Sequence, residues 1–591
     1  MRKLLRVDMS DLTVETETLP EKWERYGGRA LTDAIVFDLV PPTADALGPE
    51  NVLVFAPGFF GGTYTPNGGR LSVGAKSPLT GGIKESNAGG QAAHALGKLD
   101  IAAVIVTGKP QDASARYVLA IENDGHATIS RVDEWAGLET YALAAAVRKR
   151  RDPADVFATI TCGPAGEAGM KAAAIAVSDV LKRPNRVAAR GGLGAVMGSK
   201  GLKAVTISDA GLPFTAHADA EAFNLAMRRF AGALHAHVTS GTALPTFGTN
   251  HVIRTLDEAG ALPTRDFSCG RFEGVDAISG ETQRETTLER GGDVRHGCHT
   301  GCVIQCSRYW LGPDRMYQTK GPEYESTWAF GADCGIEELD VIGELDRACA
   351  EYGLDPTEMG VGIGVCMSEG AIAFGDGARA VAALRSVFGA GEPGRVLGDG
   401  AEAVAQALGA VRVPVVKHQA MSGLDPRTVP GVGVTFATSP MGADLSAGDT
   451  TALGMSIADA DAPEGAAADP VAQSRRLQVL NAMLDAMGLC TFVIYAVLDI
   501  PEAFTAIHEM AAAHSGEAWD AEGLWRLGRE TLTYERLFNE RAGLTAEDDR
   551  LPEWMRTEAL APRGSVFGVA DEELDRVFDF VDETAEAMGI Q

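Results

Sequence analysis

The pattern of apolar residues along this 591-residue chain changes once, near residue 210, and this change constrains the fold more than any other feature. Before it, short apolar runs such as "IAAVIVTGK" (residues 101–109) are bounded by glycine, proline or asparagine, which is typical of β-strands. After it, apolar residues recur at helical spacing, as in "GIEELDVIGELDRACAEYG" (residues 335–353). We therefore predict an α+β fold, with an N-terminal β-rich domain (residues 1–210) followed by two mainly α-helical domains (residues 211–417 and 418–591).

The net charge of the chain is 52 − 81 = −29, which argues against nucleic acid and anionic membranes as partners. No apolar run reaches the roughly 20 residues that a membrane-spanning helix needs. The N-terminal "MRKLLRVDMS" alternates like a strand and is interrupted by Asp8, so no targeting sequence is expected. The odd number of cysteines, nine, indicates a reducing compartment, and we predict a cytoplasmic protein whose cysteines are thiols or metal ligands.

One short segment carries three cysteines at every fourth position: Cys298, Cys302 and Cys306. Thiolates at this density bind iron–sulfur clusters or zinc, and three ligands on one loop need a fourth from elsewhere. Cys490 is the best distant thiolate for an iron–sulfur cluster, whereas His296 or His299 would complete a zinc site. A chance cluster of structural thiols is the third interpretation.

Two glycine-rich segments, "NAGG" (residues 87–90) and "ARGGLGAVMGSKG" (residues 189–201), have backbone that can approach a bound group closely. Glycine N–H groups at the start of a helix cradle phosphates, and Arg186, Arg190 and Lys200 add positive charge to an acidic chain. Neither segment has the spacing of a P-loop or a dinucleotide fingerprint, so tight turns remain the alternative.

Two separate helical runs end with the same chemistry, "AEYGLD" (residues 350–355) and "DAMGLC" (residues 485–490). Gly353 and Gly488 suit the position just past a helix end, where the backbone is left-handed. Ordinary helix capping explains this pattern. The functional interpretation is two equivalent grips on the two halves of a pseudo-symmetric ligand.

These motifs occur in order along nearly the whole chain, together with "TPNGGRLSVGAKSPLTGGIKESNAGG" (residues 65–90), "RVAARGGLGAVMGSKGLKAV" (residues 186–205), "GPEYESTWAFGADCGI" (residues 321–336) and "LFNERAGL" (residues 537–544). Together they resemble the tungsten-dependent aldehyde ferredoxin oxidoreductase family.

This resemblance implies that the N-terminal domain forms the base for a bis-pyranopterin tungsten cofactor, with molybdenum as the alternative metal, and that the two helical domains close over it. Arg70 would lie between the pterin and one 4Fe-4S cluster, whose implied ligands are Cys298, Cys302, Cys306 and Cys490. A Mg²⁺ ion would bridge the pterin phosphates and contact the backbone carbonyls of Asn87 and Val187. The further cofactor-binding residues that the resemblance implies are Ala88, Gly89, Gly90, Arg186, Arg190, Gly191, Gly192, Gly353, Leu354, Asp355, Asp425, Arg427, Asp485, Gly488 and Leu489.

The catalytic residues implied are Glu325, with Tyr324 and Glu323 beside it, and Asp444, which stands where aldehyde-oxidising members have a histidine. Glu325 and Asp444 would form a carboxylate pair, in which one group raises the pKa of the other and the pair works as acid or base. Alternatively, Asp444 is a turn residue or points to a buried arginine.

Two further positions depart from the family pattern. Cys298 and Cys302 are separated by three residues, whereas family members usually have two between these cysteines. Ala350 stands where the first pterin motif usually begins with aspartate, so we expect one pterin contact to be lost or moved.

The activity implied is oxidation of an aldehyde, or a related carbonyl compound, to a carboxylic acid, with electrons passing through the cluster to ferredoxin or a ferredoxin-like subunit. The alternative within the family is the catalytic subunit of a low-potential reductase complex, similar to benzoyl-CoA reductase. The alternative from another class is a zinc-stabilised scaffold protein without redox function. The substrate stays open, as does the choice between a homodimer and a hetero-oligomer.

Overall fold

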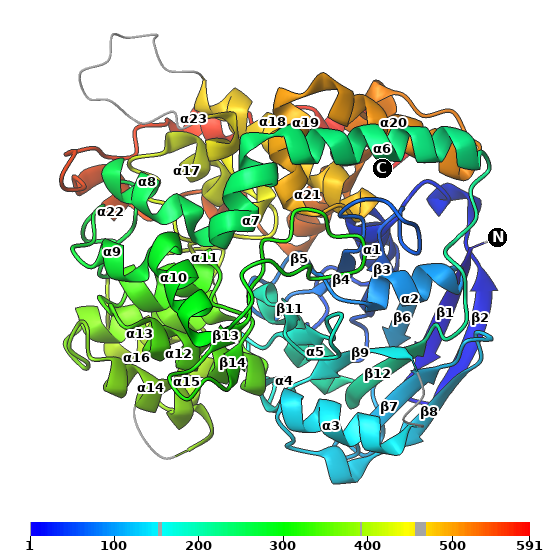
Figure 1. The fold of residues 1–591 in the computed structure, drawn as a ribbon, viewed down its shortest axis with the longest axis horizontal. Helices are drawn as coiled ribbons and strands as arrows, with labels where there is room; N and C mark the ends of the chain where they lie inside the picture. The colour runs from blue at the N-terminus through cyan, green and yellow to red at the C-terminus, as the bar shows by residue number, and fades with distance from the viewer. Residues whose placement is uncertain (1, 152–155, 390–392, 455–468, 591) are drawn as a thin grey trace.

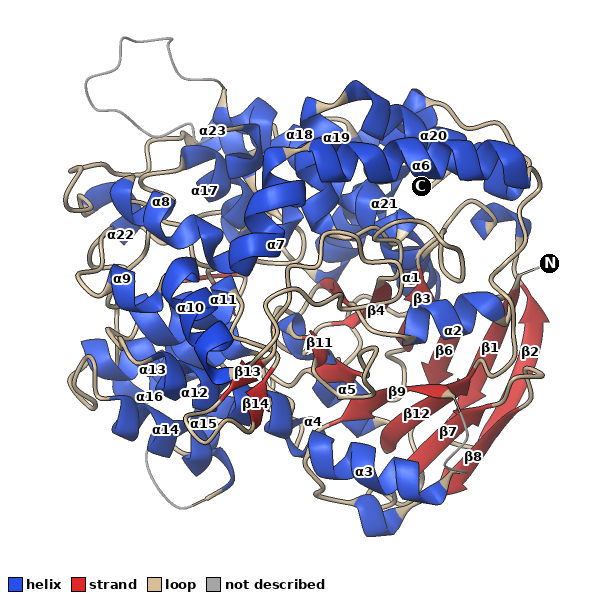
Figure 2. Cartoon of the chain, in the orientation of Figure 1, coloured by secondary structure: helices blue, strands red, loops and turns tan. Residues whose placement is uncertain are grey.

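A computed structural model describes residues 2–151, 156–389, 393–454 and 469–590 (Figure 1). The strands gather in the N-terminal part of the chain and helices form most of the rest (Figure 2), which confirms the predicted α+β class. The segment at residues 101–109 forms strand β6 (Ile101–Thr107), and the N-terminal alternation forms β1 (Lys3–Asp8).

Two six-stranded sheets make up the N-terminal part. The first has the order β2 (Thr13–Thr18), β1, β6, β3 (Leu53–Pro57), β4 (Leu71–Lys76), β5 (Ile83–Ala88). The second has the order β11 (Arg186–Ala188), β10 (Ile175–Val177), β9 (Phe157–Cys162), β12 (Leu202–Ser208), β7 (Tyr117–Ile121), β8 (Ala127–Arg131). Side chains of both sheets share one apolar core with α2 (Ala92–Lys98) and α5 (Leu193–Ser199), so the two sheets form a single rigid base.

The helical part contains helices of 4 to 22 residues among the described residues. Its main helices are α6 (Ala220–Ala236), α8 (Ile253–Glu258), α10 (Gly280–Arg290), α11 (Tyr324–Thr327), α12 (Leu339–Tyr352), α13 (Pro356–Ser368), α14 (Gly377–Arg385), α16 (Ala401–Leu408), α17 (Pro430–Thr438), α18 (Pro470–Met487), α19 (Ile494–Asp499), α20 (Pro501–Ser515), α21 (Ala521–Ala542) and α24 (Val581–Met588). Helix α6 packs along α20, and α1 (Gly28–Leu39) from the N-terminal part packs against α18 and α21. The division of the helical part at residue 417 stays a prediction.

Both predicted helix ends have the left-handed residue that their sequence requires. Gly353 ends α12 with φ 71°, and Gly488 ends α18 with φ 75°. Each end is tied to the β-rich base by backbone hydrogen bonds: the Ala174 N–H donates to the Gly353 carbonyl (2.8 Å), and the Arg70 N–H donates to the Gly488 carbonyl (3.1 Å). The two helix ends are therefore fixed relative to the sheets beneath them.

Among the described residues, no single helix is long and apolar enough to cross a membrane. One helix pair, α19 with its preceding turn and α20, passes the length and composition test together, but it is bent by 119°.

Candidate functional site

A cavity of about 410 Å³ lies where the β-rich base meets the helical part. The structure brings most of the sequence-predicted site residues to its wall: Arg70, Asn87, Ala88, Gly89, Arg186, Val187, Arg190, Cys298, Cys306, Glu323, Tyr324, Glu325, Leu354, Asp355, Asp444, Asp485 and Cys490. These residues come from segments spread over more than 400 positions of the sequence, and only the fold places them around one space.

The floor of the cavity carries Arg70 and the buried Arg186, which has donors to spare. Arg186 donates from Nη1 to Ser307 Oγ (2.8 Å), but its Nε and Nη2 are buried and have no hydrogen-bond partner among the described residues. Arg70 donates from Nε to Asn87 Oδ1 (2.6 Å). A buried guanidinium with free N–H groups is costly unless an anion binds it, and phosphate and carboxylate groups both match its geometry. The floor therefore fits a phosphate-bearing cofactor.

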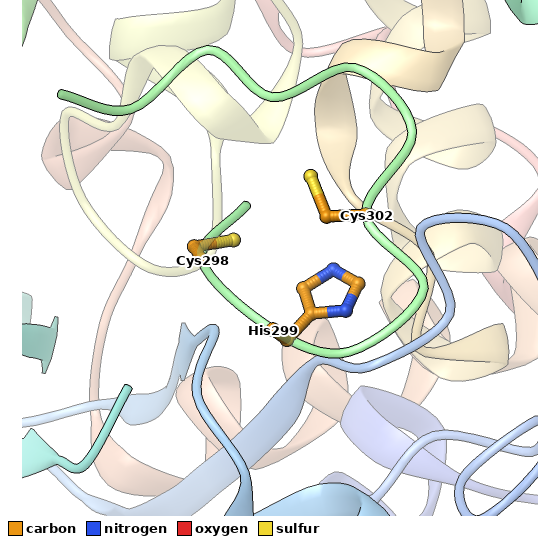
Figure 3. Close-up of side chains that lie close together, drawn as sticks. All are labelled: Cys298, His299 and Cys302. Carbon is orange, nitrogen blue, oxygen red and sulfur yellow. The ribbon is translucent and has the colours of Figure 1, made fainter. Parts of the chain in front are cut away.

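Cysteine side chains close one end of the cavity. Cys298, Cys306 and Cys490 line it, while Cys302 lies on the far side of the same loop (Figure 3). A Cβ atom on Gly89 would lie 2.9 Å from Cys298 Sγ, so glycine is needed at this point of the floor. Burial raises the pKa of the Cys490 thiol to about 11, and a bound metal would be needed to hold it as a thiolate at neutral pH. Four converging thiols fit an iron–sulfur cluster.

Asn67, which the sequence did not single out, joins the cysteine loop to the segment that carries Cys490. Its N–H donates to the Gly301 carbonyl (3.0 Å), and its own carbonyl accepts from the Cys490 N–H (2.9 Å). Its φ of 59° is left-handed, which asparagine tolerates better than most residues. The motif "TPNGG" therefore positions the thiols as well as the floor.

Asp485 and Asp355 face the cavity from the two helix-end motifs. Asp485 accepts from Arg29 Nη1 (3.2 Å) and from Asn87 Nδ2 (3.1 Å). Burial raises the pKa of Asp485 to about 6, although Arg29 and Arg70 oppose the shift. Asp355 caps α13 through the Thr357 N–H (2.9 Å) and pairs with Arg190 (3.3 Å).

Glu325 and Asp444 both reach the cavity, but their environments separate them. Burial raises the pKa of Glu325 to about 7, even with Arg190 nearby and the Gly423 N–H donating to it (3.3 Å). Burial acts on Asp444 in the same direction, but Lys84 (Nζ–Oδ2 3.2 Å) and Arg190 outweigh it and hold the pKa of Asp444 at about 2. Glu325 is thus suited to proton transfer near neutral pH, and Asp444 stays a carboxylate.

The structure changes one part of the expectation that Glu325 and Asp444 form a pair in which one carboxyl group raises the pKa of the other. The pKa of Glu325 is raised mainly by burial rather than by Asp444. The alternative interpretation expected a buried arginine beside Asp444, but the side chain in hydrogen-bond contact is a buried lysine, Lys84. No sequence signal marked Lys84, because it sits as an ordinary alternating residue in β5.

Several predicted cofactor residues do not line the cavity: Gly90, Gly191, Gly192, Gly353, Asp425, Arg427, Gly488 and Leu489. Arg427 binds Asp425 (2.8 Å) and the Phe267 carbonyl, so this pair braces a buried turn. A Cβ on Gly191 would lie 2.5 Å from the stem of Lys84, so this glycine makes room for the lysine that holds Asp444. Tyr324 lines the cavity, but its hydroxyl is engaged by the Gly423 carbonyl.

Comparisons with known proteins agree with this layout. Residues 4–209 match the family description "Aldehyde ferredoxin oxidoreductase, N-terminal domain", and residues 226–582 match "Aldehyde ferredoxin oxidoreductase, domains 2 & 3". The chain is 31% identical to the tungsten-containing aldehyde ferredoxin oxidoreductase of Pyrococcus furiosus and 30% identical to that of Pyrococcus abyssi, over 95% of this chain and 92% of each relative.

The chain is also similar to one curated protein and one solved structure at lower sequence identity. An aliphatic sulfonate oxidoreductase, WOR-like subunit, of Pyrococcus furiosus is 28% identical over 61% of this chain and 57% of its own. The solved active-site complex BamBC of benzoyl coenzyme A reductase, in complex with 1,5-dienoyl-CoA, contains a chain with TM-score 0.76 and 19% identity, covering 100% of this chain and 94% of that one. At this identity the likeness shows the fold alone.

Proposed function

Because the chain belongs to the aldehyde ferredoxin oxidoreductase family, we propose that it is a tungsten–pterin oxidoreductase that converts an aldehyde to a carboxylic acid. Its electrons would leave through a 4Fe-4S cluster to ferredoxin or a ferredoxin-like subunit in the cytoplasm. The observation that carries the proposal is the cavity itself, which holds orphaned arginine donors, converging thiols and a carboxyl group poised near neutral pH.

The cavity lining supports a proposal for the residues that would hold the cofactor. Arg186 and Arg70 would bind pterin phosphates, and the carbonyls of Asn87 and Val187 would face a Mg²⁺ ion between them. Asp485 and Asp355 would accept hydrogen bonds from the two pterin rings at the helix-end motifs. Cys298, Cys302, Cys306 and Cys490 are the candidate ligands of the cluster.

When bound, these groups would supply the two-electron oxidation at tungsten and the one-electron steps at the cluster. The overall change takes R–CHO and one water to R–COO⁻, with release of two electrons and three protons. Glu325 would accept a proton from the attacking water, because burial places its pKa at about 7. Asp444 would stay ionised beside Lys84, and it would orient the substrate rather than take part in proton transfer.

Metal analysis of protein purified without oxygen is the test. About one tungsten and about four iron per chain, with aldehyde-dependent reduction of a viologen dye, is the expected result. Zinc alone, or a well-folded sample without tungsten, would contradict the proposal. The likeness to benzoyl coenzyme A reductase keeps a reductase-complex subunit as a second candidate, and a co-purifying iron–sulfur subunit together with turnover of an aromatic CoA ester would favour it.

A further inference from the structure

Residues 422–424 pack against the rings of Tyr324 and Trp328. A Cβ atom on Gly423 would lie 2.8 Å from Trp328 Cδ2 and 2.9 Å from Tyr324 Cε1, so these rings leave no room for a side chain. The two aromatic residues are four positions apart, at the start of α11 and at the start of the π-helical turn (Trp328–Ala332) that follows it. At this spacing their side chains lie on the same helix face and form one surface.

Two hydrogen bonds join Gly423 to neighbouring residues of α11. The Tyr324 hydroxyl donates to the Gly423 carbonyl, and the Gly423 N–H donates to Glu325 Oε2 (3.3 Å). The next N–H group, that of Leu424, turns back to the Ser422 carbonyl (2.8 Å), which closes a tight turn around Gly423. This one glycine is therefore bound at its carbonyl by Tyr324 and presents its N–H to Glu325.

The segment is anchored at both ends, which leaves its middle to the tyrosine. Ser422 Oγ accepts from Arg190 Nη1 (2.9 Å) on one side, and the Asp425 N–H donates to the Ala261 carbonyl (3.1 Å) on the other. Among the described residues, the tyrosine hydroxyl is the one hydrogen-bond donor to the Gly423 carbonyl. Loss of this hydroxyl would free the centre of the turn without releasing its ends.

We propose that Tyr324 is a positioning residue rather than a catalytic one, and that its hydroxyl holds Gly423 so that the glycine N–H is fixed on the carboxylate of Glu325. The proposal rests on the proposed function, in which Glu325 is the base, and it adds the residue that orients this base.

The protonation state of the tyrosine fits this role. Tyr324 is 6% exposed, and burial raises the pKa of its hydroxyl well above the ordinary value, as do the nearby carboxyl groups of Glu325 and Asp449. The hydroxyl therefore stays protonated near neutral pH. It has a single O–H to donate, and because Gly423 accepts it, Tyr324 does not supply a proton to the substrate.

The pKa of Glu325 links this contact to a measurable pH dependence. Burial raises that pKa to about 7, against the opposing effects of Arg190 and the Gly423 N–H, and Asp444 and Asp355 add to the increase. A backbone N–H that donates to a carboxylate stabilises its ionised form. Loss of the Gly423 contact would therefore raise the pKa of Glu325, and a base that works only when ionised would then need a higher pH.

The test compares full-length wild-type protein with Tyr324→Phe and Gly423→Ala, all prepared without oxygen and normalised to tungsten and iron content. In Tyr324→Phe the acid limb of aldehyde turnover should move to higher pH by roughly one unit, the effect of losing a hydrogen bond to a charged group. Turnover at pH 6 should fall about tenfold, and the loss should shrink toward pH 9. Gly423→Ala forces the segment off the same rings and should move the limb in the same direction.

A second measurement does not depend on turnover. The infrared carboxyl band of Glu325, identified by its absence in Glu325→Gln, is titrated in each protein and should show the same upward shift. Two control variants should leave both pH midpoints unchanged. Tyr495→Phe changes another tyrosine of the cavity wall, and Gly232→Ala adds a methyl group where nothing lies within 4 Å.

Unchanged midpoints in both Tyr324→Phe and Gly423→Ala would overturn the positioning role and leave Glu325 as the base of the proposed function. An equal loss of turnover at every pH in Tyr324→Phe, with the infrared midpoint unchanged, would also overturn it, because the hydroxyl would then act on the substrate. Metal-replete wild-type protein without aldehyde turnover would overturn the proposed function, and the infrared titration would still decide whether Tyr324 positions Glu325.

Discussion

The ends of α12 and α18 share a backbone design but differ in charge. Each helix ends in a left-handed glycine, Gly353 or Gly488, that is tied to the β-rich base. In α18, Asp485 precedes the glycine by three residues and binds Arg29 and Asn87. In α12 the same position is Ala350, which lines the cavity without a polar side chain. The repeated feature is therefore the helix end, and the polar contact is not repeated.

The carboxylates near the end of α12 lie at other positions than the one Asp485 holds at the end of α18. Asp346, one turn earlier, is bound by Lys320 (3.2 Å) and Ser326 (2.7 Å), and Asp355 follows the glycine and pairs with Arg190. A pseudo-symmetric ligand would thus meet Asp485 in the last turn of α18 on one side, and Asp355, beyond the end of α12, on the other side. The two helix ends therefore share a backbone conformation but differ in the charged side chains around them.

A different contrast separates the two acids Glu325 and Asp444, which also line the cavity. Asp444 is paired with a buried lysine, whereas Glu325 has no cation in direct contact among the described residues. At both helix ends the carboxylates have a cationic partner, so the two acids Glu325 and Asp444 differ more from each other than the two helix ends do. The predictions below test whether this asymmetry matters for function.

The largest effect is expected for Glu325→Gln, which removes the only one of the two acids that can exchange a proton near pH 7. Turnover should fall by about 10²–10⁴-fold in metal-replete protein, the usual contribution of a general base. In the wild type, activity should rise with pH and level off above about 7, because the base works only when ionised and the pKa of Glu325 is about 7. Steady-state rates from pH 5.5 to 9 check both. Unchanged turnover in the variant would remove Glu325 from the mechanism.

Asp485→Ala is expected to have the next largest effect. Removing one hydrogen-bonded partner of a buried charge costs about 1–3 kcal/mol, and of its acidic partners among the described residues Arg29 would retain Glu535 (2.8 Å) and the more distant Asp33 (4.0 Å). We expect lower thermal stability and loss of most bound tungsten, measured by melting and metal analysis. Asp346→Asn, on the α12 side, is the comparison variant. Equal tungsten loss in both would show that the two grips contribute alike.

Much of this site was predictable because the chemistry lies in short motifs. The cysteines, the arginines of the floor and the two helix-end glycines were each visible as local spacing. What could not be predicted were partners from distant segments: Lys84 under Asp444, Arg29 under Asp485 and Asn67 under the cysteine loop. These are single polar residues in strand, helix and turn, and their roles arise only when the sheets meet the helices.

Some residues of the predicted site have structural contacts of their own. Asp425 and Arg427 have the residue types of a binding pair, but they bind each other and brace a turn. Gly191 looked like a phosphate cradle, yet it serves to admit the stem of Lys84. Residue type alone does not separate a side chain that binds a ligand from one that makes space for its neighbour.

Gly488→Ala should be more destabilising than Gly353→Ala, which sharpens the comparison of the two helix ends. A left-handed alanine costs about 1–2 kcal/mol at either position. At Gly488 the new Cβ would also lie 2.7 Å from Gly58 Cα, whereas at Gly353 the closest atom, Gly163 Cα, is 3.1 Å away. Thermal melting of the two variants side by side gives the order. The reverse order would mean that the α12 end is the more tightly docked.

The smallest effect is expected for Ala350→Asp, which makes the two motifs alike in sequence. The new carboxylate would lie one turn from Asp346, and like charges four residues apart on a helix destabilise it by about 0.2–0.5 kcal/mol. Tungsten content and turnover should therefore change by no more than about twofold. Ala350→Asn is the uncharged control of the same shape. A several-fold gain in tungsten retention in Ala350→Asp, absent from the asparagine variant, would contradict this expectation. It would show that Asp355 and Arg190 do not replace the contact that an aspartate at position 350 makes. The end of α12 would then lack a contact that the end of α18 has.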